Sequence, residues 1–254
     1  MAARSAAGAA AHLLPHLRPG MRLLDVGCGP GSITLDLAAA IAPGEAVGVD
    51  IAPVQVERAR ALAAERGVGN VRFEAADAYA LPFPDAAFDA VNANALLQHL
   101  GEPVRALREF RRVLRPGGLA AVTDPDWSTW LIEPATPLLD LLRAWRLQVY
   151  AHNGGDAGYA RHQRRLLLAA GFARAECRVG VREFGTPEGV QEHARIFAEQ
   201  LRSFAPTIVQ AGFADAATVE AVAEELRAWG ERPDATAAFM VFRSLGWVAP
   251  PGQP

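Results

Sequence analysis

The sequence contains no lysine, so all 25 of its basic residues are arginine. This absence excludes a mechanism that forms a Schiff base on a lysine, and with it lysine-bound pyridoxal phosphate. Cysteine is scarce too, because only Cys28 and Cys177 occur among 254 residues. Neither belongs to a CxxC pair or to a metal-like cluster, so we expect no metal site and no disulfide framework.

Long hydrophobic runs are also absent. No stretch reaches about 18 uninterrupted apolar residues, so we expect no transmembrane helix. The alanine-rich segment 1–17 is interrupted by His12, Pro15 and His16, which makes it a poor secretory signal, and we expect a cytoplasmic protein. The net charge of −3 gives no general attraction to nucleic acid or to anionic membranes, so we expect neither as a partner. The run of arginines at 105–115 is interpreted as a solvated helix face.

Strand and helix patterns alternate through the first half of the chain. They predict strands at 21–26, 46–50, 71–75, 87–92 and 119–123, and helices at 32–41, 53–66 and 103–114. Short, mostly unbroken apolar strands are typical of a parallel sheet that helices cover on both faces. We therefore predict an α/β fold with a Rossmann-like, doubly wound, mostly parallel sheet.

The second half of the chain is less regular. Its patterns predict helices at 136–150, 159–170, 187–204 and 215–230, and strands at 175–184 and 237–248, which bring the sheet to seven strands. Because no Gly- or Ser-rich linker occurs, we interpret residues 1–254 as one domain with its core at 18–124. The segments 125–158 and 186–235 are then helical insertions, which we expect to form a lid over the site.

A glycine-rich loop joins the first strand to the first helix. It reads Asp25-Val-Gly-Cys-Gly-Pro-Gly31, and its glycines let the backbone turn sharply and let a ligand approach the main chain. The helix that follows aims its free N–H groups at that ligand. Asp50 ends the second strand, where a carboxylate is placed to accept hydrogen bonds from two ribose hydroxyls. The alternative is that Asp50 only caps the helix that begins near Pro53.

Two classes of cofactor fit a glycine loop followed by an acid on the second strand. A nicotinamide dinucleotide needs G-x-G-x-x-G or A, but position 32 is serine and the third glycine is Gly31. Asp25 would also place an anion beside the pyrophosphate. This carboxylate instead suits a cationic amino group, and S-adenosylmethionine has an ammonium group and no phosphate.

Six further segments follow in a familiar order. These six segments are Gly48-Val-Asp-Ile51, Ala76-Asp-Ala78, Leu81-Pro-Phe-Pro-Asp85, Phe88-Asp-Ala-Val91, Leu97-Gln-His-Leu100 and Arg112-Val-Leu-Arg-Pro-Gly-Gly118. With the glycine-rich loop they carry the following resemblance. The chain resembles the class I S-adenosylmethionine-dependent methyltransferases. Within them it is most similar to the small-molecule branch that includes the ubiquinone/menaquinone C-methyltransferases.

This resemblance implies a cofactor site for S-adenosylmethionine, with S-adenosylhomocysteine as product. The implied cofactor-binding residues are Arg4, Asp25, Gly27, Gly29, Gly31, Asp50, Ile51, Asp77, Ala78 and Asn94. The glycines would face the methionine part, Asp50 the ribose, and Ile51 and Asp77 the adenine. Asn94 would lie near the methionine carboxylate or the sulfonium. Asp77 has the alternative role of a turn former, and Arg4 that of a terminal residue without a partner.

The resemblance also implies transfer of a methyl group to an O, C or N nucleophile of a small organic molecule, such as a quinone or a secondary metabolite. Methyl transfer from a sulfonium is an in-line displacement with a neutral leaving group, so most of the acceleration comes from positioning. A base is needed only where the nucleophile must lose a proton. His99 is the first candidate, because its unperturbed pKa is near 6.5, and a surface or packing role is its alternative. Asp124 is the second candidate.

Residues after the fifth strand are candidates for binding the acceptor. They are Asp126, Trp127, Trp130, Tyr150, His152 and Tyr159, and the alternative is that the aromatic ones only hold the insertion to the core. Residues 125–254 contain no motif that identifies the acceptor. Two other functions stay open: a reaction without methyl transfer that uses the bound cofactor, and a cofactor-binding regulatory subunit. Release of S-adenosylhomocysteine separates methyl transfer from both.

Overall fold

The computed structural model describes residues 5–252, and these divide into two compact units. We call residues 5–124, 161–178 and 242–252 the sheet unit, and residues 125–160 and 179–241 the helical unit. The two expected insertions, 125–158 and 186–235, both fall in the helical unit, and their role as a lid stays a prediction. Within the described chain, no helix has both the length and the apolar content needed to cross a membrane.

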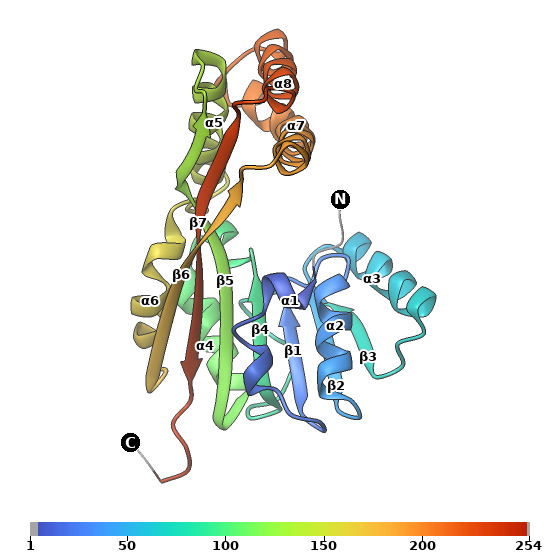
Figure 1. The fold of residues 1–254 in the computed structure, drawn as a ribbon. Helices are drawn as coiled ribbons and strands as arrows, with labels where there is room; N and C mark the ends of the chain where they lie inside the picture. The colour runs from blue at the N-terminus through green and yellow to red at the C-terminus, as the bar shows by residue number, and fades with distance from the viewer. Residues whose placement is uncertain (1–4, 253–254) are drawn as a thin grey trace. The chain divides into compact units, whose positions relative to one another are not determined.

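Seven strands of the described chain form one sheet in the order β3-β2-β1-β4-β5-β7-β6 (Figure 1). They are β1 (Arg22–Val26), β2 (Glu45–Asp50), β3 (Val71–Ala75), β4 (Phe88–Asn94), β5 (Leu114–Glu133), β6 (Arg174–Phe184) and β7 (Thr236–Trp247). The pairs β1–β2, β1–β4, β2–β3 and β4–β5 are parallel. Beyond them, Gly117 N donates to the carbonyl of Ala249 and Val248 N to that of Gly118, a pairing that runs antiparallel. The predicted seven-stranded, mostly parallel sheet is confirmed.

Helices accompany the strands in both units (Figure 1). The sheet unit contains α1 (Ala6–Ala9), η1 (Leu14–His16), α2 (Ser32–Ile41), α3 (Pro53–Arg66), η2 (Leu97–His99), α4 (Pro103–Val113) and α6 (Gln163–Ala169). The helical unit contains α5 (Pro137–His152), α7 (Pro187–Gln210) and α8 (Ala216–Gly230). The unit boundaries fall within β5, β6, β7 and the short turn η3 (Tyr159–His162).

Local sequence explains where these helices begin and end. Proline occupies the first turn of α3, α4, α5 and α7, where its missing N–H costs nothing. The side chain of Thr136 accepts a hydrogen bond from Leu139 N at the start of α5, and Asp215 accepts one from Thr218 N at the start of α8. Gly67 ends α3 with a φ of 64°, a conformation that favours glycine.

Each unit has its own apolar core. In the sheet unit, Leu23, Leu37 and Ile41 are fully buried against one face of the strands. On β2, a Cβ at Gly48 would lie 2.5 Å from the ring of Phe73, so only glycine lets that ring pack onto the strand. The core of the helical unit combines aromatic side chains, among them Trp130 of β5, Phe197 of α7 and Trp229 of α8, with a larger number of aliphatic ones.

Three predicted elements differ from the structure by more than two residues at one end. The helix predicted at 187–204 continues to Gln210 as α7. The strand predicted at 119–123 is a 20-residue strand, Leu114–Glu133. It continues past Asp124-Pro125 because a residue before proline favours extended backbone, and the aromatic and β-branched residues that follow favour a strand. The helix predicted at 159–170 is a 3-10 turn, Tyr159–His162, followed by α6.

Candidate active site

The predicted cofactor residues gather at the carboxyl ends of the central strands. The register pairs Asp25 of β1 with Gly48 of β2 on one side and with Asn92 of β4 on the other. Because parallel strands end at the same edge of a sheet, the loop after β1 lies beside the last residues of β2 and β4. This edge is where open α/β sheets bind their ligands.

The three glycines of the loop have different surroundings. All have positive φ values, 71° at Gly27, 54° at Gly29 and 84° at Gly31. A Cβ at Gly27 would lie 2.9 Å from Cδ1 of Leu96, and one at Gly31 would lie 2.8 Å from Cβ of Ala59. A Cβ at Gly29 would meet no atom of the described residues within 4 Å. Gly29 is therefore the position where the loop backbone is open to a ligand.

Asp50 ties this loop to the end of β2. Its Oδ2 accepts a hydrogen bond from Gly29 N at 3.0 Å, and its Oδ1 accepts one from Ala52 N at 2.9 Å. The N-cap residue of α3 is Ala52, so the alternative that Asp50 caps this helix does not hold. Because a carboxylate oxygen accepts two hydrogen bonds, Asp50 has acceptor capacity left for ribose hydroxyls. The adjacent Ile51 is 74% exposed, an apolar side chain presented at the predicted adenine position.

Asp25 is a buried carboxylate behind the loop. It is 2% exposed, and its two oxygens accept hydrogen bonds from Thr34 Oγ1 at 2.5 Å and from Asn92 Nδ2 at 2.7 Å. Burial raises the pKa of Asp25 to about 6, although both hydrogen bonds act in the opposite direction. Its contact with a cationic amino group stays a prediction.

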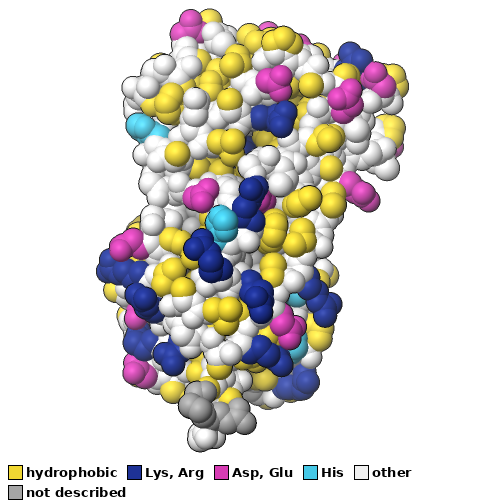
Figure 2. Space-filling model, turned by 90° about the vertical axis from the view of Figure 1, so that its left-hand side faces the viewer, with side chains coloured by type: hydrophobic (Ala, Val, Ile, Leu, Met, Phe, Trp, Pro, Cys, Tyr) yellow, Lys and Arg dark blue, Asp and Glu magenta, His cyan; other side chains and the backbone are white. Residues whose placement is uncertain are grey.

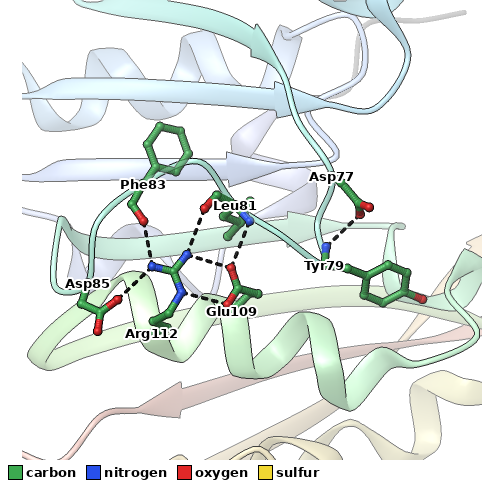
Figure 3. Close-up of polar contacts among 7 residues, drawn as sticks. All are labelled: Asp77, Tyr79, Leu81, Phe83, Asp85, Glu109 and Arg112. Atoms are coloured by element: carbon green, nitrogen blue, oxygen red, sulfur yellow. Dashed lines mark hydrogen bonds and ion pairs between the residues drawn. The ribbon is translucent and has the colours of Figure 1, made fainter.

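The loop after β3 carries the predicted adenine contacts. Asp77 is exposed, and its Oδ1 accepts a hydrogen bond from Tyr79 N at 2.8 Å (Figure 3). This is the turn-forming role that the sequence left as an alternative, and a contact with adenine stays a prediction. Ala78 is buried, with 8% of its surface exposed.

Arg112 of α4 holds the same loop in place (Figure 3). Its guanidinium donates to the carbonyl oxygens of Leu81 and Phe83 at 2.9 and 2.7 Å. It also pairs with the carboxylates of Asp85 and Glu109 at 2.9 and 2.7 Å. The hydrogen bond from the guanidinium lowers the pKa of Glu109 below its ordinary value. One arginine therefore fastens the loop that carries the predicted adenine contacts to α4.

The N-terminal part of the described chain reaches the end of β4. Nδ2 of Asn94 donates to the carbonyl of Ala9, the last residue of α1, at 3.2 Å. This bond places α1 beside a predicted cofactor residue. Arg4, which precedes α1 and is also a predicted cofactor residue, lies outside the described residues.

The two candidate bases differ in their surroundings. His99 ends η2 and is exposed. Asp124 lies in β5 and is fully buried, and its Oδ2 accepts a hydrogen bond from Gln163 Nε2 at 3.2 Å. Oε1 of Gln163 in turn accepts from Ser244 Oγ at 2.8 Å. The sheet unit thus holds Asp124 in a buried polar chain, and its role as a base stays a prediction, as does that of His99.

The predicted acceptor residues all belong to the helical unit. They are Asp126, Trp127, Trp130, Tyr150, His152 and Tyr159. Only His152 among them is exposed, and its ring packs edge-on against Phe213. The Trp127 and Trp130 rings lie 5.8 Å apart inside the core of the unit, which supports the alternative that these aromatics serve packing. Contact of any of the six with an acceptor stays a prediction.

Arginine side chains are frequent on the lower part of the face shown in Figure 2, and fewer acidic side chains lie among them. On α4, Arg105 pairs with Glu102 at 3.2 Å, and beyond its end Arg115 pairs with Asp89 at 2.8 Å. This mixture fits the solvated face predicted for 105–115. Among residues 5–252, no group of three or more His, Cys, Asp or Glu side chains is placed to hold a metal ion.

A family model described as a methyltransferase domain matches residues 17–161, more than half of the chain. The chain belongs to this family. Together with the sheet order, this match confirms the predicted class I S-adenosylmethionine-dependent methyltransferase fold, with S-adenosylmethionine as the cofactor of the family. The open backbone at Gly29 and the Asp50 carboxylate fit that cofactor, which presents a ribose and an amino-acid part.

Two relatives of this methyltransferase are named for small molecules. The nocamycin O-methyltransferase of Saccharothrix syringae is 33% identical over 182 residues, which cover 70% of this chain and 59% of that protein. The ubiquinone/menaquinone biosynthesis C-methyltransferase UbiE of Ectopseudomonas mendocina is 39% identical over 128 residues, or 50% and 48% of the two chains. The crystal structure of the cyclase SpnF matches with a TM-score of 0.55 and 28% identity, and covers 92% of this chain and 77% of that chain.

This methyltransferase chain spans about half the length of the curated relatives it matches. We therefore treat the activity of the whole protein and the identity of its acceptor as proposals.

Sequence reasoning missed several buried polar residues of this methyltransferase. Thr34 and Gln163 act by holding the carboxylates of Asp25 and Asp124, and nothing in a single sequence marks them. Asn92, which also binds the Asp25 carboxylate, is marked only by its place at the end of a predicted strand. Arg146 and His193 carry a signal that was available. Each occupies a buried position on the apolar face of a helix, Arg146 between Leu142 and Val149 on α5, and His193 between Val190 and Phe197 on α7.

Proposed function

We propose that this protein transfers a methyl group from S-adenosylmethionine to an O, C or N nucleophile of a small organic molecule of the quinone or secondary-metabolite type, by in-line displacement. The observation that carries this proposal is the loop backbone left open at Gly29 and held by Asp50. The relatives named for nocamycin and for quinone biosynthesis support a small-molecule acceptor.

The residues of the sheet unit have separate tasks in this proposal. The glycine loop binds the amino-acid part, Asp50 accepts from the ribose hydroxyls, and Ile51 covers the adenine. When bound, S-adenosylmethionine supplies an electrophilic methyl group on a sulfonium. Because that leaving group is neutral, the protein needs to position the acceptor and to exclude water more than to stabilise charge. Where the acceptor loses a proton, His99 or Asp124 takes it.

The first test is calorimetric binding of S-adenosylmethionine to the wild type and to Asp50→Asn, with NAD as a control ligand. We expect micromolar binding to the wild type and at least tenfold weaker binding to the variant, because its amide supplies one acceptor oxygen instead of two. The matched control is Asp140→Asn, an exposed carboxylate of α5 that pairs with Arg143. A wild type that does not bind S-adenosylmethionine, or that binds NAD equally well, would sink the proposal.

A second function is favoured by one observation. The cyclase SpnF shares the fold over 92% of this chain at 28% identity. The same fold is therefore compatible with a reaction that consumes no methyl group, or with a regulatory role. Incubation with labelled S-adenosylmethionine and a panel of phenols, quinones and acidic carbon compounds separates the functions. Methyl transfer produces S-adenosylhomocysteine in a one-to-one ratio with product, and the alternatives produce none.

We also propose that the protein works in the cytoplasm on a free small molecule and not on nucleic acid. The net charge of −3 supports the choice of a small molecule over nucleic acid. Binding to nucleic acid at physiological salt, measured by a mobility shift, is expected to be absent.

A further inference from the structure

Helix α5 carries an arginine in the middle of its apolar face. Arg146 is 3% exposed and lies on the same side as Leu142 and Val149. Its guanidinium donates to Oε1 of Gln200 at 2.8 Å and also hydrogen-bonds with the hydroxyl of Tyr150. No carboxylate of the described residues forms an ion pair with it. Buried charged side chains are normally paired, so this arrangement is unusual.

Aromatic rings surround the charge. Cζ of Arg146 lies 4.3 Å from the ring centroid of Trp127, 5.0 Å from Trp130, 4.9 Å from Phe197 and 5.4 Å from Phe204. Cation–π contacts attract the guanidinium, but a ring face cannot replace its hydrogen bonds with water. Burial accordingly lowers the pKa of Arg146 to about 10, which still leaves the side chain charged at neutral pH.

Further polar atoms in the same cluster have no hydrogen-bond partner among the described residues. They are Nε of Arg146, Nε1 of Trp130 and Trp229, and both ring nitrogens of His193. The rings link them into one group, because His193 lies 5.6 Å from Trp130 and 5.8 Å from Trp229 between ring centroids. Guanidinium and indole groups only donate hydrogen bonds. The cluster therefore offers a buried positive charge without a counter-charge, and Nε of Arg146 and the two indole N–H groups are donors without an acceptor among the described residues.

We propose that this cluster in the helical unit binds the ionised acid group of a flat, conjugated organic acid. Oxygens of the anion accept hydrogen bonds from Arg146 and neighbouring donors, and the flat part of the ligand packs among the aromatic rings. That this acid is the methyl acceptor rests on the proposed function. Ligand binding would supply the missing counter-charge, which explains why a costly buried arginine is present.

The less buried neighbours of Arg146 lie on α7. Gln200 and Phe204, one helical turn apart, are only partly buried, whereas Trp127, Trp130 and Phe197 are buried. The amide of Gln200 is a neutral partner that an anion displaces from the guanidinium. A charged oxygen is the stronger acceptor for this donor.

The test compares two probes of the same shape, 2-naphthoate and the neutral 2-naphthamide, by calorimetry without S-adenosylmethionine. The variants are Arg146→Met, which removes the charge, and Arg143→Met as the matched control. Arg143 lies one turn earlier on α5, and its side chain is 41% exposed and pairs with Asp140. We expect naphthoate to bind the wild type and the control equally, and Arg146→Met at least tenfold more weakly. Naphthamide should bind the wild type at least tenfold more weakly than naphthoate.

Melting temperatures separate this inference from a purely structural role of Arg146. If the unpaired charge is kept for a ligand, Arg146→Met without ligand melts at or above the temperature of the control variant, because an apolar side chain replaces a costly charge. A melting temperature several degrees below that control would show that the core needs the arginine, and would overturn the inference. Equal binding of the two probes by the unmodified protein would overturn it without reference to any variant, as would no binding of naphthoate.

The outcome also separates the inference from the proposed function. S-Adenosylmethionine binding to Arg146→Met is expected to equal that of the wild type. Arg146-dependent naphthoate binding by a protein that binds no S-adenosylmethionine would leave the anion site standing and remove the methyltransferase proposal. Binding of S-adenosylmethionine with no preference for naphthoate would remove the anion site alone.

Discussion

Two glycines of the cofactor loop should respond differently to the same substitution. In Gly29→Ala the new Cβ meets open space, so the loss of stability is limited to about 1 kcal/mol of backbone strain at a φ of 54°. In Gly31→Ala it meets Cβ of Ala59 at 2.8 Å and Cζ of Phe73 at 2.9 Å, which adds about 2 kcal/mol from overpacking. We expect Gly29→Ala to fold well and to bind S-adenosylmethionine at least tenfold more weakly.

Thermal unfolding and calorimetry on both variants check this prediction. Gly67→Ala, at an open position with a φ of 64° in the C-cap of α3, is the control for strain without a ligand contact. Unchanged affinity in Gly29→Ala would contradict the assignment of the open face to the cofactor.

The buried carboxylate of Asp25 should cost stability at neutral pH. Its folded-state pKa of about 6 lies above the ordinary value of 3.8, so the folded state binds more protons than the unfolded state between these values. The contribution of Asp25 to stability is therefore greatest below pH 4, falls as pH rises to 6, and stays low above it. Asp25→Asn, which keeps hydrogen-bonding groups toward Thr34 and Asn92, should be more stable than the wild type by about 1–3 kcal/mol at pH 7.5. Urea unfolding of the cofactor-free protein at pH 4 and pH 7.5 measures the difference, and an equal effect at both pH values would refute it.

At the residue scale, the sequence alone predicts the residues whose role depends on the local backbone conformation or on a position at the end of a strand. The loop glycines and Asp50 are of this kind, because a turn between a strand and a helix fixes where they lie. Arg146 and His193 are not, because their burial depends on α5 and α7 packing within one core. The only sign of this burial in the sequence is that each residue lies on an apolar helix face.

At the scale of elements, Arg112 links α4 to the loop after β3. Arg112→Met removes two hydrogen bonds to backbone carbonyls and two ion pairs, which should lower the stability by about 2 kcal/mol. Because this loop carries Asp77, we also expect the affinity for S-adenosylmethionine to fall several-fold. Arg108→Gln, at an exposed position of the same helix, is the matched control. Chemical unfolding and calorimetry give the two readouts, and a variant that loses stability but keeps full affinity would separate the loop from the cofactor site.

Most elements follow from the sequence because their signals are local. The bounds predicted for α2, α3 and β3 agree with the structure, since proline, glycine and apolar periodicity mark each end. Strand β5 is longer than predicted because Asp124-Pro125 resembles a strand end, although proline holds the preceding residue extended. An extended segment continues as a strand only if a neighbour pairs with it, and that pairing involves residues far away in the chain.

At the scale of the whole molecule, the division into two compact units is invisible in the sequence. The boundaries fall inside β5, β6 and β7, where no change of composition occurs and no linker is present. Long-range packing decides such a division. Tryptophan fluorescence follows mainly the helical unit during unfolding. Trp127, Trp130, Trp145 and Trp229 lie in that unit, and only Trp247 lies in the sheet unit.

The whole protein should lose stability in mild acid. Burial lowers the folded-state pKa of His193 to about 3 and that of His12 to about 4, both below the ordinary 6.5. As pH falls below 6.5, these two histidines take up protons in the unfolded state but stay neutral in the folded state. The free energy of unfolding therefore falls progressively. Protonation of Asp25 stabilises the folded state as pH falls, which opposes the effect of the histidines. Asp25 is one group against two histidines, and its protonation begins only near pH 6. The balance is a loss of about 1 kcal/mol per pH unit between pH 6 and 4.

His193→Phe should remove the part of this loss that belongs to the helical unit, because a phenyl ring suits the aromatic cluster and does not titrate. Tryptophan fluorescence during urea unfolding at pH 7 and pH 5 follows that unit, with the exposed His152→Phe as control. We expect the stability difference between the two pH values to shrink in His193→Phe and to persist in the control. If acid destabilised all three proteins equally, the sensitivity would originate elsewhere, and a neutral His193 in the folded core would be ruled out as its source.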